Sequence, residues 1–113
     1  MNLEEFLVSK IRNSWLELDV PMSLYARKSS RMVNGSLIKV FDIASVESAN
    51  PGRGTFSGFI DRLEKKIEEV GLDGVYVESI LNPRFAALLE RRGYIKTNKD
   101  EICLNMFKQI RMR

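Results

Sequence analysis

Apolar side chains at the start of the chain recur at intervals of three and four residues, at Leu3, Phe6, Leu7, Ile11, Trp15 and Leu18. This spacing places them on one face of an α-helix. The pattern therefore predicts an amphipathic helix over residues 2–18, with Trp15 packed on its buried face. Pro21 lies just beyond this segment and marks its end, since proline disfavours helical geometry in the residue before it.

A β-hairpin is predicted next, with strands over residues 23–33 and 36–48 joined by Asn34-Gly35. Asn-Gly is a strong hairpin signal, because a type I′ turn needs positive φ at both central residues. The second strand carries apolar residues at both odd and even positions. That pattern is typical of a central strand covered on both faces.

The rest of the chain alternates helices and strands, with Gly71 and Gly93 as natural helix ends. The predicted elements are a helix over 55–70 whose buried stripe ends at Val70, a strand over 75–81, a helix over 83–92, and short strands over 94–97 and 102–108. This order predicts an α/β fold, in which a mixed sheet is flanked by helices. A chain of 113 residues is expected to form a single domain, residues 1–113.

Composition then removes several kinds of chemistry. The sequence contains no histidine and a single cysteine, Cys103. Catalysis by a Ser-His or Cys-His pair, imidazole metal sites and an internal disulfide are therefore excluded. We expect no metal, and Cys103 is interpreted as a small buried hydrophobic residue.

The charge distribution indicates an ordinary solvated surface. Eighteen Lys and Arg residues stand against fifteen Asp and Glu residues, giving a net charge of +3, and the basic groups are short and scattered. A nucleic-acid site built from Arg27, Lys28 and Arg31 is a less favoured hypothesis, because alternation along a strand divides these three between two faces. No apolar run approaches the roughly 20 residues of a membrane span, and the acidic start is unlike a signal peptide. We therefore expect a cytoplasmic protein.

One segment has a specific physical use: Gly52-Arg53-Gly54-Thr55-Phe56-Ser57, which opens the helix predicted from residue 55. The first turn of a helix has unpaired N–H groups and a partial positive charge. Glycines before it let a phosphate group approach the backbone closely. The segment is neither a P-loop nor a dinucleotide-binding fingerprint. Alone, it is compatible with either a tight turn or a phosphate site.

Two motifs together resemble a known family. The segment from Val46 to Gly54, followed by Phe59, Ile60 and Leu63, resembles the coenzyme A signature of the GNAT superfamily of acyl-CoA N-acyltransferases. Further on, the spacing of the family's strand–Asn–helix–Gly–Phe motif is matched by Asn82, Leu89, Gly93 and Tyr94. The resemblance runs from the Asn34-Gly35 hairpin to the C-terminus.

The resemblance implies a coenzyme site and a reaction. In such proteins the two central parallel strands, here 36–48 and 75–81, separate at one end and admit the pantetheine arm. That arm is expected to pair with the backbone near Ala44, Ser45 and Val46 and to contact Asn82. The pyrophosphate is expected on the amides of Gly52, Arg53, Gly54, Thr55, Phe56 and Ser57. The implied activity is transfer of an acetyl group from acetyl-CoA, or of a related acyl group, to a primary amine of an unidentified acceptor.

The sequence departs from the family pattern at several positions. Pro51 stands where Arg or Gln is usual, Phe56 where Gly or Ala is usual, and Leu89 where a tyrosine acid is usual. The N-terminal part is expected to be reduced, with one helix in place of the first strand and two helices. These departures support an alternative, a non-catalytic GNAT-like protein that binds a protein partner. A homodimer is also a reasonable expectation, because a reduced N-terminal part leaves apolar surface to cover.

Three carboxylates are candidate catalytic groups by position. Asp42 shares a strand face with Val40, so apolar surroundings are expected to raise its pKa. The other interpretation is that Asp42 lies at an exposed strand end or pairs with a basic neighbour. Glu47 lies near the end of the same strand, beside the glycine segment. It is interpreted either as a catalytic base or as a solvated side chain. Glu78 alternates with Tyr76 on the next strand and faces either the cleft or water. Tyr76 itself is interpreted as a packing residue.

Overall fold

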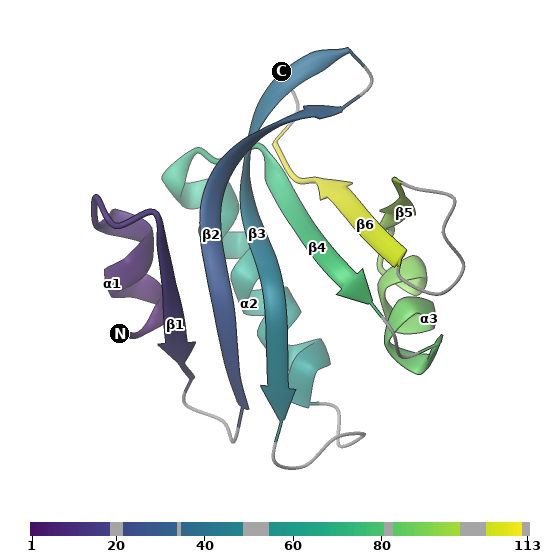
Figure 1. The fold of residues 1–113 in the computed structure, drawn as a ribbon, viewed down its shortest axis with the longest axis horizontal. Coiled ribbons are helices and arrows are strands. Elements are labelled where there is room, and N and C mark those ends of the chain that lie inside the picture. Colours follow the sequence, from purple (N-terminus) through teal and green to yellow (C-terminus); the bar gives the residue numbers. More distant parts are fainter. Residues whose placement is uncertain (19–21, 34, 49–54, 81–82, 98–103, 112–113) are drawn as a thin grey trace.

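The computed structural model describes residues 1–18, 22–33, 35–48, 55–80, 83–97 and 104–111. In chain order the elements are α1 (Leu3–Val8), β1 (Asn13–Glu17), β2 (Met22–Val33), β3 (Ser36–Ser48), α2 (Thr55–Val70), β4 (Gly74–Ile80), α3 (Pro83–Arg91), β5 (Ile95–Lys96) and β6 (Leu104–Gln109). The strands form one sheet in the order β1-β2-β3-β4-β6-β5 (Figure 1). Strands β3 and β4 are parallel and the other neighbours are antiparallel. The predicted α/β class with a mixed sheet is confirmed.

The N-terminal segment differs from its prediction. Helix α1 ends at Val8, and residues 13–17 form an edge strand paired with β2. On this strand Leu16 is fully buried, whereas Trp15 is 47% exposed and its ring lies 5.4 Å from that of Tyr25. The predicted helix over 2–18 was therefore wrong beyond its first turns. The expected loss of the first strand was wrong as well, because backbone pairing with β2 outweighs the helical spacing.

Lys28 of β2 holds α1 against the sheet. Its ammonium group donates hydrogen bonds to the carbonyl oxygens of Phe6, at 2.7 Å, and Ser9, at 2.8 Å. Both carbonyls lie at the C-terminal end of α1, where unpaired acceptors and the helix dipole favour a cation. Burial lowers the pKa of Lys28 from its ordinary value.

The hairpin follows its prediction closely. Strands β2 and β3 begin their pairing at Val33 and Ser36, and Gly35 between them has φ of +81°. From this turn the register runs without interruption to the pair Ala26–Ile43. It then shifts by one residue, because the next residue of β2, Tyr25, pairs with Ser45, so that Ala44 forms a β-bulge on β3.

The described helices pack against one face of the sheet. The main core joins sheet residues such as Phe41 and Ile43 to helical residues, which include Phe6, Phe59, Leu63 and Leu89. Helix α2 runs behind β2, β3 and β4 in Figure 1. A second, smaller cluster on the other face contains Ile38, Val40, Tyr76 and Phe107 and no helical residue. Strand β3 is therefore buried on both faces as predicted, but the described helices cover only one of them; we call the other the helix-free face.

The later elements match their predictions with small shifts. Helix α2 ends at Val70, which is 40% exposed rather than part of the buried stripe, and β5 is limited to Ile95–Lys96. Buried Asp73, just before β4, contacts β3 and the residue after β6. Its carboxylate accepts a hydrogen bond from Lys39 N at 2.8 Å, and its carbonyl accepts one from Ile110 N at 2.8 Å. None of the described helices has the length and apolar composition needed to cross a lipid bilayer.

Candidate functional site

The site begins where β3 and β4 separate. Their parallel pairing runs from Val40–Gly74 to Ile43–Val77 and ends there in the described ladder. Both strands continue beyond that point, β3 to Ser48 and β4 to Ile80. The edge of β3 that faces β4 is therefore left unpaired by that strand over Ala44, Ser45 and Val46.

Irregular backbone on both strands accompanies the separation. The bulge at Ala44 lies directly after the last paired residue of β3. On β4, the pairing with β6 shifts between Val77 and Ile80, and Ser79 within this interval has φ of +55°. Bulges bend a strand and increase its local twist. Local geometry on each strand thus turns the two backbones apart at the same level of the sheet.

Four charged side chains gather beside this point on the helix-free face, and we call them the arginine–carboxylate cluster: Arg27, Arg31, Asp42 and Glu78. Arg31 Nη2 donates to Asp42 Oδ2 at 2.6 Å, and Arg27 Nη2 lies 3.7 Å from the same oxygen. Glu78 accepts a hydrogen bond from each arginine, at a different carboxylate oxygen. Three strands therefore contribute to one neutral cluster.

Asp42 is the most enclosed member of the cluster. Its side chain is 1% exposed, against 20% for Glu78. Burial raises the pKa of the Asp42 carboxyl above its ordinary value, and the hydrogen bond from Arg31 offsets only part of that effect. The expected rise in pKa is thus confirmed, together with the alternative interpretation that Asp42 pairs with a basic neighbour.

Several polar atoms around Asp42 are buried without a hydrogen-bond partner in the described part of the chain. They are Asp42 Oδ1, Ser29 Oγ, and the Nε atoms of Arg27 and Arg31. Buried polar groups in proteins are nearly always paired with protein, water or ligand. The cluster therefore has free hydrogen-bonding capacity at the point where β3 and β4 separate.

The remaining predicted site residues are distributed as follows. Ala44 and Val46 are half-buried and Ser45 is exposed on β3, while the side chain of Glu47 lies outside the described residues. Gly52, Arg53, Gly54 and Asn82 lie outside them entirely, as do Pro51 and Cys103 and the side chains of Thr55 and Phe56. The structure thus brings Asp42 and Glu78 together.

Ser57, in the first turn of α2, is already engaged within the protein. Its hydroxyl accepts a hydrogen bond from Arg92 Nη2, and Arg92 also forms an ion pair with Asp61 one turn further along α2. The guanidinium holds the pKa of the Asp61 carboxyl below its usual range. A cation from the end of α3 is therefore fixed beside the first turns of α2.

Leu89, at the position where the family pattern has a tyrosine acid, and the nearby Tyr94 are both core residues. Leu89 is fully buried and Tyr94 is 2% exposed. The Tyr94 hydroxyl donates to Glu64 at 3.2 Å, and burial, together with that carboxylate, raises the pKa of Tyr94 above its ordinary value. Tyr76 is also buried, as expected for a packing residue. A tyrosine with a raised pKa is a poor proton donor to a thiolate at neutral pH.

The cations of the nucleic-acid hypothesis all have internal partners. Arg27 and Arg31 belong to the arginine–carboxylate cluster, while Lys28 faces the opposite side of β2 and contacts α1. The predicted division of the three between two faces is confirmed. The role of the two arginines in the site was not predicted, although counting back from the Asn34-Gly35 turn places Arg27 opposite Asp42.

The sequence matches no protein-family model and no curated protein. Solved structures, however, share its fold. A chain of the KacTA–DNA complex aligns with a TM-score of 0.58 and 19% identity, over 79% of this chain and 58% of that one. A mutant of the toxin AtaT, bound to the C-terminus of the antitoxin AtaR and to acetyl-CoA, aligns with a TM-score of 0.58 and 15% identity over the same shares.

A GNAT-family acetyltransferase from Listeria monocytogenes aligns with a TM-score of 0.52 and 11% identity, over 79% of this chain and 64% of that one. The chain thus has a GNAT-like fold, and the fold predicted from its motifs is confirmed. It spans less than two thirds of the length of these neighbours.

Proposed function

We propose that this protein transfers an acetyl group from acetyl-CoA to a primary amine. The observation that carries the proposal is the separation of β3 and β4 after Ile43 and Val77, with a bulge at Ala44. An unpaired strand edge is a row of backbone donors and acceptors, which suits the two amides of a pantetheine arm. The acetyl-CoA bound to the AtaT neighbour supports this choice of coenzyme.

The coenzyme is proposed to lie along β3 and to end at the start of α2. The pantetheine arm pairs with the backbone of Ala44, Ser45 and Val46, and Asn82 contacts it from the other side. The pyrophosphate binds the amides between Gly52 and Ser57, where the N-terminus of α2 favours an anion. Coenzyme A is an intracellular metabolite, so we further propose a cytoplasmic location.

The transfer step is a direct attack on the thioester. The amine nitrogen forms a bond to the carbonyl carbon, the carbon–sulfur bond breaks, and coenzyme A leaves as a thiolate that takes up a proton from water. The nitrogen loses a proton, and Glu78, the more accessible of the two clustered carboxylates, is proposed to receive it through water. Asp42 is proposed to be a positioning residue that orients Arg31 through their hydrogen bond. Glu47 is a further candidate base. The arginine charges stabilise negative charge that develops on the reacting group.

The proposal is tested first by coenzyme binding. Calorimetric titration with acetyl-CoA and with free coenzyme A is expected to show a single site for each. Gly54→Asp is expected to weaken both affinities at least tenfold, because a carboxylate beside the pyrophosphate is repelled, while Gly54→Ala has a smaller effect. Equal affinity in the wild type and Gly54→Asp would count against the phosphate site.

Turnover is a separate measurement. Release of the coenzyme A thiol in the presence of primary amines is expected in the wild type and reduced in Glu78→Gln. Tight coenzyme binding without turnover on any amine would favour the alternative of a non-catalytic, partner-binding protein. Absence of binding to either form of the coenzyme would overturn the proposal.

A further inference from the structure

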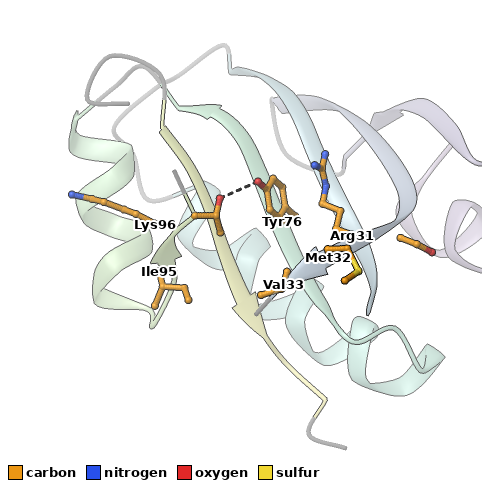
Figure 2. A pocket seen from close by; sticks show the side chains of 8 residues that line it. Arg31, Met32, Val33, Tyr76, Ile95 and Lys96 are labelled. Atoms are coloured by element: carbon orange, nitrogen blue, oxygen red, sulfur yellow. Dashed lines mark hydrogen bonds between the residues drawn. The ribbon is translucent and has the colours of Figure 1, made fainter. Parts of the chain in front are cut away.

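We propose that a pocket on the helix-free face binds the apolar body of the acceptor amine, an inference that rests on the proposed transferase function. The pocket has a volume of about 460 Å³ and lies between the end of the β2–β3 hairpin and β5 (Figure 2). The residues that line it are Ser30, Arg31, Met32, Val33, Tyr76, Ile95, Lys96 and Thr97. Its volume falls in the range of small-molecule sites.

The lining of the pocket combines the apolar side chains of Met32, Val33 and Ile95 with polar residues. Met32 is 66% exposed and Ile95 is 54% exposed, so a ligand in the pocket would remove two large apolar side chains from water. The Tyr76 hydroxyl and Thr97 Oγ1 lie 2.9 Å apart and form a hydrogen bond across the pocket wall (Figure 2). The exposed Met32 and Ile95 therefore favour a ligand that has an apolar part.

The pocket is continuous with the arginine–carboxylate cluster. Arg31 lines the pocket and bonds to Asp42, and its guanidinium lies 4.0 Å from the centroid of the Tyr76 ring. Tyr76 is the direct partner of Asp42 in the β3–β4 ladder, and the last pair of that ladder, Ile43–Val77, follows immediately. A molecule that lies in the pocket beside Arg31 would thus direct one end toward the point where the proposed thioester lies.

Charge narrows the class of acceptor further. In the described part of the chain no acidic side chain lines the pocket. The side chain of Lys96 points away from the pocket in Figure 2 and pairs with Glu90 at 3.3 Å. The guanidinium of Arg31, the other charged group on the wall, is paired with Asp42 and Glu78, so a second ammonium group finds no unpaired carboxylate there. The pocket therefore favours a primary amine with one charge and an apolar body over a polyamine.

The test compares the binding of hexylamine, propylamine and spermidine, with and without free coenzyme A, by calorimetry and by amide chemical shifts. Each buried methylene is expected to tighten binding about fourfold, so hexylamine should bind more than tenfold tighter than propylamine, and spermidine more weakly than hexylamine. The amides of Met32, Val33, Ile95 and Thr97 are expected to shift.

A pair of variants gives the control. Met32 and Leu37 are cross-strand partners with nearly equal exposure, 66% and 65%, but only Met32 lines the pocket. Met32→Ser is expected to reduce the advantage of hexylamine severalfold, and Leu37→Ser to leave it unchanged. Equal affinity for the two alkylamines, or equal behaviour of the two variants, would overturn the proposal that the pocket binds the acceptor amine.

The titrations without coenzyme keep the two proposals distinct. Selective hexylamine binding by a protein that does not bind acetyl-CoA would support the proposed amine site and overturn the proposed transferase function. Acetyl-CoA binding accompanied by amine affinities that do not depend on chain length would overturn the pocket and retain the coenzyme site.

Discussion

Arg31 Nη2 lies 2.6 Å from Asp42 Oδ2, although the two residues are not partners in the β2–β3 ladder, where Arg31 pairs with Ile38 and Asp42 with Arg27. The side chain of Arg31 therefore runs along the sheet to reach Asp42 and covers Tyr76 on its way. This arrangement encloses a carboxylate and neutralises it at the same time.

The first prediction concerns the pKa of Asp42. Burial raises this pKa, and the hydrogen bond and charge of Arg31 act against the rise. Arg31→Met is therefore expected to raise the pKa of Asp42 further, as measured by a carboxyl NMR titration. Arg27→Met is the matched control, with a smaller expected increase because Arg27 lies 3.7 Å from the same oxygen. A fall in the pKa of Asp42 in Arg31→Met would contradict this account.

The same shift predicts a dependence of stability on pH. The folded-state pKa of Asp42 lies above its ordinary value of 3.8, so the folded protein binds this proton more tightly than the unfolded chain. The stability that this group contributes is then fully present below pH 3.8 and is lost as pH rises through the folded-state pKa. Urea unfolding across this window should show that contribution in the wild type and not in Asp42→Asn. Identical pH profiles for the two proteins would refute it.

Part of the candidate site was accessible from sequence. The Asn34-Gly35 turn fixes the register of the hairpin, and the placement of Asp42 on the central strand follows from it. The contact between Arg31 and Asp42 was not accessible, because it depends on how far a long side chain bends along the sheet. The position of Glu78 against both arginines required the β3–β4 register, which no local signal in the sequence specifies.

Gly74 provides a test of packing at the start of β4. A Cβ atom at this position would lie 2.5 Å from the carbonyl oxygen of Lys108 and 2.6 Å from the Phe107 ring. Gly74→Ala is therefore expected to lower the free energy of unfolding by about 1–3 kcal/mol. Gly58→Ala is the control, since a Cβ there meets nothing within 4 Å, and in a helix interior it should gain up to about 1 kcal/mol. Chemical denaturation measures both, and a neutral Gly74→Ala would argue against the close approach of β4 and β6.

Lys28 allows the docking of α1 to be tested. Lys28→Met keeps the apolar stem but removes the donor to Phe6 and Ser9, and we expect a loss of about 1–2 kcal/mol in unfolding free energy. Amide exchange should increase mainly in α1. Lys39→Met is the control. The side chain of Lys39, on neighbouring β3, is exposed, so this substitution is expected to change the unfolding free energy by less than about 0.5 kcal/mol. Equal effects of the two substitutions would show that the contact with α1 contributes nothing.

The prediction of the fold succeeded where local chemistry and tertiary structure agree. The hairpin, α2, β4 and α3 all have turn or cap residues at their ends. The segment over residues 13–17 has no such residues at its ends. Leu16 is its one buried side chain, so the segment lacks the alternation of apolar and polar residues by which a strand is predicted. Its strand conformation comes from pairing with β2, which is a long-range effect. The placement of the helices on one face likewise depends on tertiary packing.

Ser79 connects backbone strain to the proposed coenzyme site. Its φ of +55° lies in the left-handed region, which costs a non-glycine residue roughly 1 kcal/mol. Ser79→Gly is therefore expected to raise the free energy of unfolding by up to about 1 kcal/mol. The control is Ser45→Gly, at an exposed position on β3, which should lower the free energy of unfolding by about 0.5–1 kcal/mol. Because Ser79 lies in the bulge that turns β4 away from β3, added freedom there should weaken acetyl-CoA binding even as the fold becomes more stable. Calorimetry and urea unfolding on the same samples measure the two effects. If Ser79→Gly left affinity unchanged while raising stability, the strained backbone would have no part in holding the strands apart.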